Sequence, residues 1–195
     1  MTKPGSAFFL ILLSLWAKPF QGQAVRYELD PARTKIEFSV SATMHTVHGN
    51  FQLKHGLIHF NPTTEEAGGL VVVDVKSGNT GNEGRDRKMH RVVLQSDRFP
   101  EATFKPTRIT GAGNLRQNPT VHVEGILNVN GADHPLVLEV PVQQSGDELI
   151  STIRFVVPYT QWGLKNPSTL LLHVNEKATV EITASGRLAQ GAAIQ

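Results

Sequence analysis

The chain has 195 residues, with 19 Lys and Arg against 17 Asp and Glu, and it contains no cysteine. Without cysteine there is no disulfide bond, no thiolate-ligated metal and no thiol nucleophile. The two excess basic residues, Lys3 and Lys18, lie in the first 24 residues. The rest of the chain is therefore formally neutral, which removes the electrostatic basis for binding nucleic acid.

Residues 1–24 predict a cleaved signal peptide. Lys3 precedes an apolar run from Ala7 to Ala17, and a tripeptide with small outer residues, Gly22 to Ala24, follows it. The run is about half the roughly 20 residues that a membrane-spanning helix needs, so an uncleaved anchor is the less favoured alternative. We therefore expect a periplasmic or secreted protein without stable membrane insertion.

The mature part has about 170 residues, which is enough for one domain with its own core. We expect this domain over residues 25–188 and a flexible tail over residues 189–195. Neither an internal repeat nor a linker divides the domain. Its oligomeric state is left open, with a homodimer as one alternative.

Apolar and polar residues alternate from residue 25 onward, as in Ile36, Phe38 and Val40. This period of two predicts strands with one apolar face and one solvated face. Asn130-Gly131, between two such runs, predicts a tight hairpin. The strands are expected over residues 25–30, 34–43, 46–60, 69–78, 101–110, 119–129, 134–144, 148–157 and 171–187, with an interruption of the last strand around Asn175-Glu176.

One helix is expected, from Arg85 to Gln95, with Asn82 as a candidate N-cap. The surrounding segment, Gly81–Arg91, is the most charged part of the chain. We favour a solvated helix face with local ion pairs. The alternative is a basic rim that meets an anionic lipid headgroup.

The strand set, with a single helix, predicts a barrel or a sandwich. A closed barrel of about eight strands has no free edges and can enclose a small ligand. Several phenylalanines occupy expected inward positions, and Trp162 follows a strand. In a barrel, such side chains either fill the lumen or line an apolar cavity.

The eight histidines raise the possibility of a metal site, but only His55 and His59 have the even spacing of a same-face strand pair. Two histidines without a completing ligand are too few for a closed site, so no metal is expected. The sequence also lacks the G-x-S-x-G, H-E-x-x-H and P-loop motifs. We therefore expect no catalytic residues and no enzymatic activity.

Four groups of segments form a recognisable series along the chain: Tyr27–Pro31 with Ile36–Val40, Gly81–Glu83 with Arg85, Asp86 and His90, Asp97–Pro100 with Thr103 and Phe104, and Gly125–Gly131 with His134–Leu138. In their order and spacing they resemble the YceI-like, polyisoprenoid-binding family. The chain departs from the family pattern at Arg85–Asp97, which is longer and more helical, and at Trp162–Ser168.

The resemblance implies an all-β fold: an extended, lipocalin-like, eight-stranded antiparallel β-barrel with one short helix. It further implies that the lumen binds an isoprenoid quinone, a polyprenyl phosphate or a similar long-chain lipid, without a metal or covalent cofactor. We expect Arg85 and Asp86 at the mouth, where a structural role is favoured. The side chains expected to line the cavity are Phe38, Val40, Phe51, Phe104, Leu127, Leu138, Phe155 and Trp162.

Two other functions remain open at this stage. The first is a secreted, fully packed barrel with a structural or stress-response role. The second is a lipid- or sugar-modifying hydrolase that uses acids within strands, such as Asp74 or Glu139. Such an enzyme requires titratable groups that converge in one pocket with shifted pKa values.

Overall fold

The computed structural model describes residues 24–190, so all of the expected signal peptide except Ala24 lies outside the described residues. Nine strands form one antiparallel sheet. The strands are β1 (Val25–Leu29), β2 (Lys35–Ser41), β3 (Thr46–Phe60), β4 (Ala67–Asn79), β5 (Glu101–Thr110), β6 (Thr120–Val129), β7 (Ala132–Ser145), β8 (Glu148–Val157) and β9 (Ala178–Gln190). The helical segments are α1 (Glu83–Lys88), the π-helical η1 (Met89–Leu94) and the 3₁₀-helical η2 (Ala112–Gln117).

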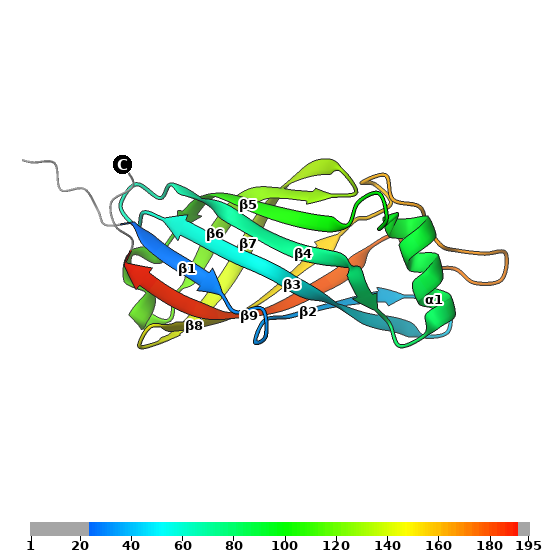
Figure 1. The fold of residues 1–195 in the computed structure, drawn as a ribbon, viewed down its shortest axis with the longest axis horizontal. Coiled ribbons are helices and arrows are strands. Elements are labelled where there is room, and N and C mark those ends of the chain that lie inside the picture. Colours follow the sequence, from blue (N-terminus) through cyan, green and yellow to red (C-terminus); the bar gives the residue numbers. More distant parts are fainter. Residues whose placement is uncertain (1–23, 191–195) are drawn as a thin grey trace, which may run out of the picture.

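The sheet closes on itself, so the predicted antiparallel barrel is confirmed. Consecutive strands from β2 to β9 pair with one another, and β9 pairs back to β2 through Ile36 and Ile182. This ring has eight strands. The short β1 pairs with the far halves of β3 and β9, where β2 no longer lies between them. The barrel is therefore long, and Figure 1 shows it with α1 at one end and β1 towards the other.

The β6–β7 hairpin has the predicted tight turn. Val129 lies opposite Ala132, so the loop contains only Asn130 and Gly131. Both residues have positive φ, 53° and 77°. This is the conformation of a type I′ turn, which matches the twist of the flanking strands and which Asn-Gly adopts readily.

The predicted helix is also confirmed, although its second half is wound differently. The Asn82 side chain accepts a hydrogen bond from the Arg85 backbone N–H and caps α1. The chain then continues without a break into the π-helical η1. A separate short 3₁₀ helix, η2, follows β5 and has no counterpart among the predicted elements.

The last strand was predicted to begin too early. Residues 158–177 form a long loop, and β9 begins only at Ala178. Leu170, Leu171 and Leu172 imitate a strand in the sequence, but Leu170 and Leu171 are almost fully exposed. Within this loop the Tyr159 hydroxyl donates to the Asn175 carbonyl oxygen at 2.6 Å. At its other end, β9 extends through Ala189 and Gln190, the first two residues of the expected tail, whose remainder lies outside the described residues.

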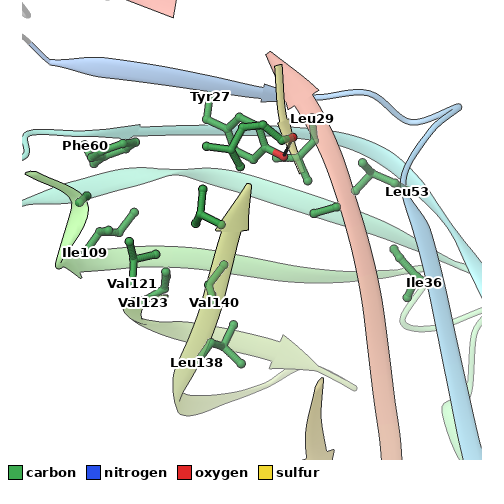
Figure 2. Packing of buried hydrophobic residues seen from close by; sticks show 14 residues of the cluster. Tyr27, Leu29, Ile36, Leu53, Phe60, Ile109, Val121, Val123, Leu138 and Val140 are labelled. Atoms are coloured by element: carbon green, nitrogen blue, oxygen red, sulfur yellow. Dashed lines mark hydrogen bonds between the residues drawn. The ribbon is translucent and has the colours of Figure 1, made fainter. Parts of the chain in front are cut away.

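The buried apolar side chains face the inside of the barrel and come from most of its strands (Figure 2). They include Tyr27, Phe60, Val123 and Leu138, which are 6–7% exposed. Among the described residues, no large side chain is less than 2% exposed. Protein interiors are normally close-packed, so this pattern indicates that the core side chains border a cavity.

Candidate functional site: an apolar lumen

An apolar cavity of about 170 Å³ runs inside the barrel. Its 25 lining residues come from every strand except β2, and from η2. They extend from Phe60 and Leu149 near the β1 end to Leu127 and Phe155 towards the α1 end. A small volume with so many lining residues is long and narrow, a shape that matches a linear chain better than a compact ligand.

Four of the eight predicted lining residues border this cavity: Phe104, Leu127, Leu138 and Phe155. Phe38, Val40, Phe51 and Trp162 do not. The rings of Phe38 and Phe51 contact each other with their centroids 5.2 Å apart. Val40, two residues along β2 from Phe38, is half-buried opposite Val47.

Aromatic rings lie against glycines on neighbouring strands and so take up little of the lumen. Phe104 illustrates the arrangement, because a Cβ placed on Gly125 would lie 2.5 Å from its Cζ atom. Only glycine permits this approach, so the ring can lie close to the barrel wall. The close pairs are Phe38 with Gly49, Phe51 with Gly78, and Phe104 with Gly125. Of these three rings, only Phe104 borders the cavity.

Polar groups are few in the lumen. Among the 25 lining residues only Tyr27, Thr103 and Ser151 carry a polar side chain, and none is an acid, a histidine or a basic residue. The Tyr27 hydroxyl donates to the Leu149 carbonyl oxygen at 3.2 Å (Figure 2). Burial raises the pKa of this phenol above its ordinary value. The lumen is therefore suited to apolar contact and offers little acid–base chemistry.

Arg85 and Asp86, the predicted mouth residues, fasten α1 to the end of β4. Arg85 donates from Nε to the Thr80 hydroxyl at 2.7 Å and from Nη2 to the Thr80 carbonyl oxygen at 2.8 Å. Asp86 accepts from the Thr80 backbone N–H at 2.9 Å. In η1, His90 Nε2 lies 2.8 Å from the Gly78 carbonyl oxygen and adds a second attachment to β4. These contacts hold the helical segment across one end of the barrel.

Trp162 lies in the loop 158–177 and stacks on His134 of β7. The two ring centroids are 4.0 Å apart and the rings are inclined by 8°. The same loop is joined to α1, because Lys88 Nζ donates to the Pro167 carbonyl oxygen at 2.5 Å. The two segments that depart from the family pattern therefore meet at the same end of the barrel.

The charged groups lie on the outside and do not converge. Asp74 and Glu139 alternate along their strands with the cavity-lining Val73 and Leu138, so both acids face away from the lumen. On the exposed surface, the hydrogen bond from Arg33 lowers the pKa of Glu148. Over residues 24–190, no three His, Cys, Asp or Glu side chains are grouped so that they could hold a metal ion.

A second hollow, of about 410 Å³, lies on the outside of the barrel. Gln143, Gln144 and Glu148 contribute to its lining and leave it open to solvent. It lacks the enclosed, largely apolar wall that distinguishes the lumen.

The lining residues that were not predicted are mostly aliphatic, including Val71, Ile153, Ile182 and Ala184. For Ile153, Ile182 and Ala184 the alternation in the sequence contains the signal, because they share the phase of the inward residues of their strands. Val71 lies in the continuous apolar run Leu70–Val73, where alternation gives no phase. The positions of aromatic residues alone do not predict the cavity lining, because Phe38, Phe51 and Trp162 do not border the cavity.

Fold and site together define a class: a closed antiparallel barrel with an almost wholly apolar cavity in its interior. The model of the YceI-like domain matches residues 27–186, and the chain belongs to this family. A UPF0312 protein of Vibrio parahaemolyticus is 27% identical over 148 residues, which cover 73% of this chain and 76% of that protein.

Solved structures share the fold at low sequence identity. BcnA of Burkholderia cenocepacia aligns with a TM-score of 0.65 and 17% identity, covering 83% of this chain and 99% of that one. A polyisoprenoid binding domain from Saccharophagus degradans aligns with a TM-score of 0.64 and 15% identity, covering 84% and 98%. A YceI protein of Campylobacter jejuni aligns with a TM-score of 0.59 and 17% identity, covering 74% and 86%.

Proposed function

We propose that this protein binds and carries a polyisoprenoid or similar long-chain lipid in the barrel lumen, without catalysing a reaction on it. The observation that carries the proposal is the narrow cavity of about 170 Å³, in which 22 of 25 lining residues lack a polar side chain. The Saccharophagus degradans relative is described as a polyisoprenoid binding domain, which supports the choice of ligand class.

The size of the cavity limits how a chain can enter it. A dry apolar cavity of about 150 Å³ holds one benzene molecule, so the lumen has room for roughly one or two five-carbon isoprene units. A longer chain must widen the lumen or extend beyond it. Widening is feasible because the core side chains already border free space and need not separate from close neighbours.

The energetics require several isoprene units. At about 0.8 kcal/mol for each buried carbon, one unit contributes about 4 kcal/mol and three contribute about 12 kcal/mol. Association itself costs about 4–15 kcal/mol. Useful affinity therefore needs a chain of at least three or four buried units, which favours a polyisoprenoid over a short terpene.

The two alternative functions fit the site less well. A fully packed barrel has no reason to enclose an elongated cavity or to hold aromatic rings against glycines at its wall. A hydrolase needs convergent acids, whereas Asp74 and Glu139 face outward and Tyr27 is the only titratable lining residue. Export to the periplasm or beyond is part of the proposal and rests on the signal-peptide pattern of residues 1–24.

Mass spectrometry tests both parts of this proposal. The chain is expressed with its leader in a bacterium, purified from the periplasm and analysed intact under native conditions. We expect a mature start near Val25 and a bound apolar lipid in a one-to-one complex. An intact Met1 contradicts cleavage. Absence of bound lipid, together with no thermal stabilisation by a C20 isoprenoid alcohol, overturns the carrier function.

A further inference from the structure

At its α1 end the apolar wall of the lumen is followed by a polar residue, His134. His134 on β7 has the same phase as Leu136 and Leu138, which line the cavity, and it lies opposite Leu127, which also lines it. Because side chains alternate along a strand, the imidazole faces the interior just beyond the apolar cavity. An apolar tunnel is thus followed by a polar residue at one end.

Two polar atoms near this end are buried without a partner. Within the described part of the chain, His134 Nε2 and Asn130 Oδ1 are the buried side-chain nitrogen and oxygen atoms that make no hydrogen bond. Both belong to the β6–β7 hairpin, four positions apart. Leaving a buried polar group unpaired is costly, so each of these two atoms calls for an explanation. The Trp162 indole, 4.0 Å from the imidazole, covers one face of the histidine.

We propose that Asn130 and His134, whose ring stacks on Trp162, bind the polar end of the lipid whose chain occupies the lumen. This inference rests on the proposed carrier function and names the ligand more closely. Imidazole Nε2 donates or accepts according to its tautomer, while an amide oxygen accepts. A hydroxyl group can both donate and accept, so it can pair with the imidazole in either tautomer or with the amide oxygen.

The two unpaired atoms are themselves uncharged, and they match an uncharged end group such as the hydroxyl of a polyprenol or a quinol. A buried phosphate requires cationic partners. Arg98 is the cation nearest to this hairpin that the contacts show, because its guanidinium lies over the Phe99 ring, which packs against Gly131. Comparison of an alcohol with a phosphate therefore decides between the two end groups.

Three C20 probes test this assignment: geranylgeraniol, the hydrocarbon of matched length and geranylgeranyl phosphate. Trp162 is the only tryptophan after residue 24, so its fluorescence reports on the site directly. The His134→Phe variant keeps an aromatic ring for the stack and removes both nitrogens. His122→Phe on β6 is the control, because His122 is exposed on the outer face.

We expect wild type and His122→Phe to bind the alcohol about tenfold more tightly than the hydrocarbon, the gain of one buried hydrogen bond. His134→Phe should bind both equally. If that variant does not fold, Asn130→Gly, which tolerates the positive φ of 53°, should show the same loss of selectivity. Equal binding of alcohol and hydrocarbon by wild type, or tightest binding of the phosphate, overturns the anchor and leaves the carrier function standing. Binding of no probe overturns both.

A separate observation concerns the outside of the same end. Met44, Leu170 and Leu171 are 90%, 100% and 91% exposed, the highest values for large apolar side chains among the described residues. Their loops are joined, because the Thr43 N–H donates to the His173 carbonyl oxygen at 2.9 Å. In Figure 1 the loop 158–177, in orange, projects past α1.

The surroundings of this tip are basic. The neighbouring helical segment 83–94 contains four basic and two acidic residues, and Lys88 joins it to the loop at Pro167. Three protruding side chains provide much less than the roughly 800 Å² per partner of a stable dimer. Apolar side chains beside basic residues are instead typical of contact with an anionic membrane surface.

We infer that the tip formed by Met44, Leu170 and Leu171 docks on an anionic lipid bilayer, whatever the lumen holds. Flotation with phosphatidylglycerol vesicles tests this, with phosphatidylcholine vesicles for comparison. The double change Leu170→Ser and Leu171→Ser should weaken binding at least about tenfold. Val137→Ser, at a 66% exposed site on β7, should not. Unchanged flotation of the double variant overturns the inference. Light scattering that finds wild type as a dimer and the double variant as a monomer overturns it as well.

Discussion

Filling the lumen should abolish lipid binding without unfolding the barrel, and Ala184→Phe is the substitution that tests this. Ala184 on β9 is 4% exposed and lines the cavity. A cavity of about 150 Å³ accepts a benzene molecule, so the cavity of about 170 Å³ can accept the new phenyl ring.

The effect on stability should be small, because two terms oppose each other. Burying a phenylalanine side chain contributes about 1.5–3 kcal/mol, and overpacking costs about 1–3 kcal/mol. The effect on binding should be large. The ring takes the space of roughly one isoprene unit, worth about 4 kcal/mol, which corresponds to a loss of about a thousandfold in affinity.

Urea unfolding and titration with a C20 isoprenoid alcohol measure the two effects separately. Thr152→Phe on β8 is the matched control, because Thr152 is exposed on the outer face beside the lining residue Ser151. We expect Thr152→Phe to bind like wild type. If Ala184→Phe folds and also binds like wild type, the ligand does not occupy the lumen and the reasoning fails.

Three further predictions concern the barrel itself. Gly125→Ala should destabilise the barrel by about 1–3 kcal/mol in urea unfolding, because the new Cβ would lie 2.5 Å from Phe104 Cζ and 2.6 Å from the Lys105 carbonyl oxygen. It should also weaken lipid binding, because the Phe104 ring must move into the lumen; unchanged affinity would show that the ring does not shape the lumen. Because burial raises the pKa of Tyr27, the neutral phenol stabilises the fold fully below about pH 10, and this stabilisation declines as the pH rises further. Tyr27→Phe should therefore reduce the fall of the unfolding free energy with pH above about pH 10. An equally steep fall in the variant would contradict this. Asn82→Ala should cost about 1 kcal/mol in thermal unfolding through loss of the α1 cap, and an unshifted midpoint would refute that role.

The barrel could be predicted from the sequence because its signals are local. Alternation fixes which side chains share a face, and Asn130-Gly131 fixes one hairpin and its register. The loop 158–177 could not be predicted in the same way. Its leucines have strand-like composition, but the loop is organised by hydrogen bonds between residues far apart in the loop, such as Tyr159 with Asn175.

The candidate site could be predicted only in part, because the relevant contacts cross between strands. Phase in the sequence places Phe38 and Phe104 inside the barrel, but it does not indicate how far along the axis the cavity extends. The stack of Trp162 on His134 joins a loop to a strand 28 positions earlier, and no local pattern signals it. The sequence therefore did not identify His134, the partner of Trp162, as a site residue, although His134 lies within a segment that carries the family resemblance.

Glycines on neighbouring strands explain how aromatic side chains can point inward while the barrel retains a lumen. A phenylalanine that projects straight inward from a strand fills the centre of an eight-stranded barrel, whose interior is only wide enough for side chains or one small ligand. Where the neighbouring strand has glycine, as Gly125 beside Phe104, the ring can lie against the backbone and the centre stays free. Glycine in a strand costs stability, so its repeated use beside inward aromatic rings is consistent with selection for space rather than for packing. At the one such ring that lines the cavity, Phe104, the glycine lies two positions from the ring's direct partner Leu127, so the lumen keeps its free space there.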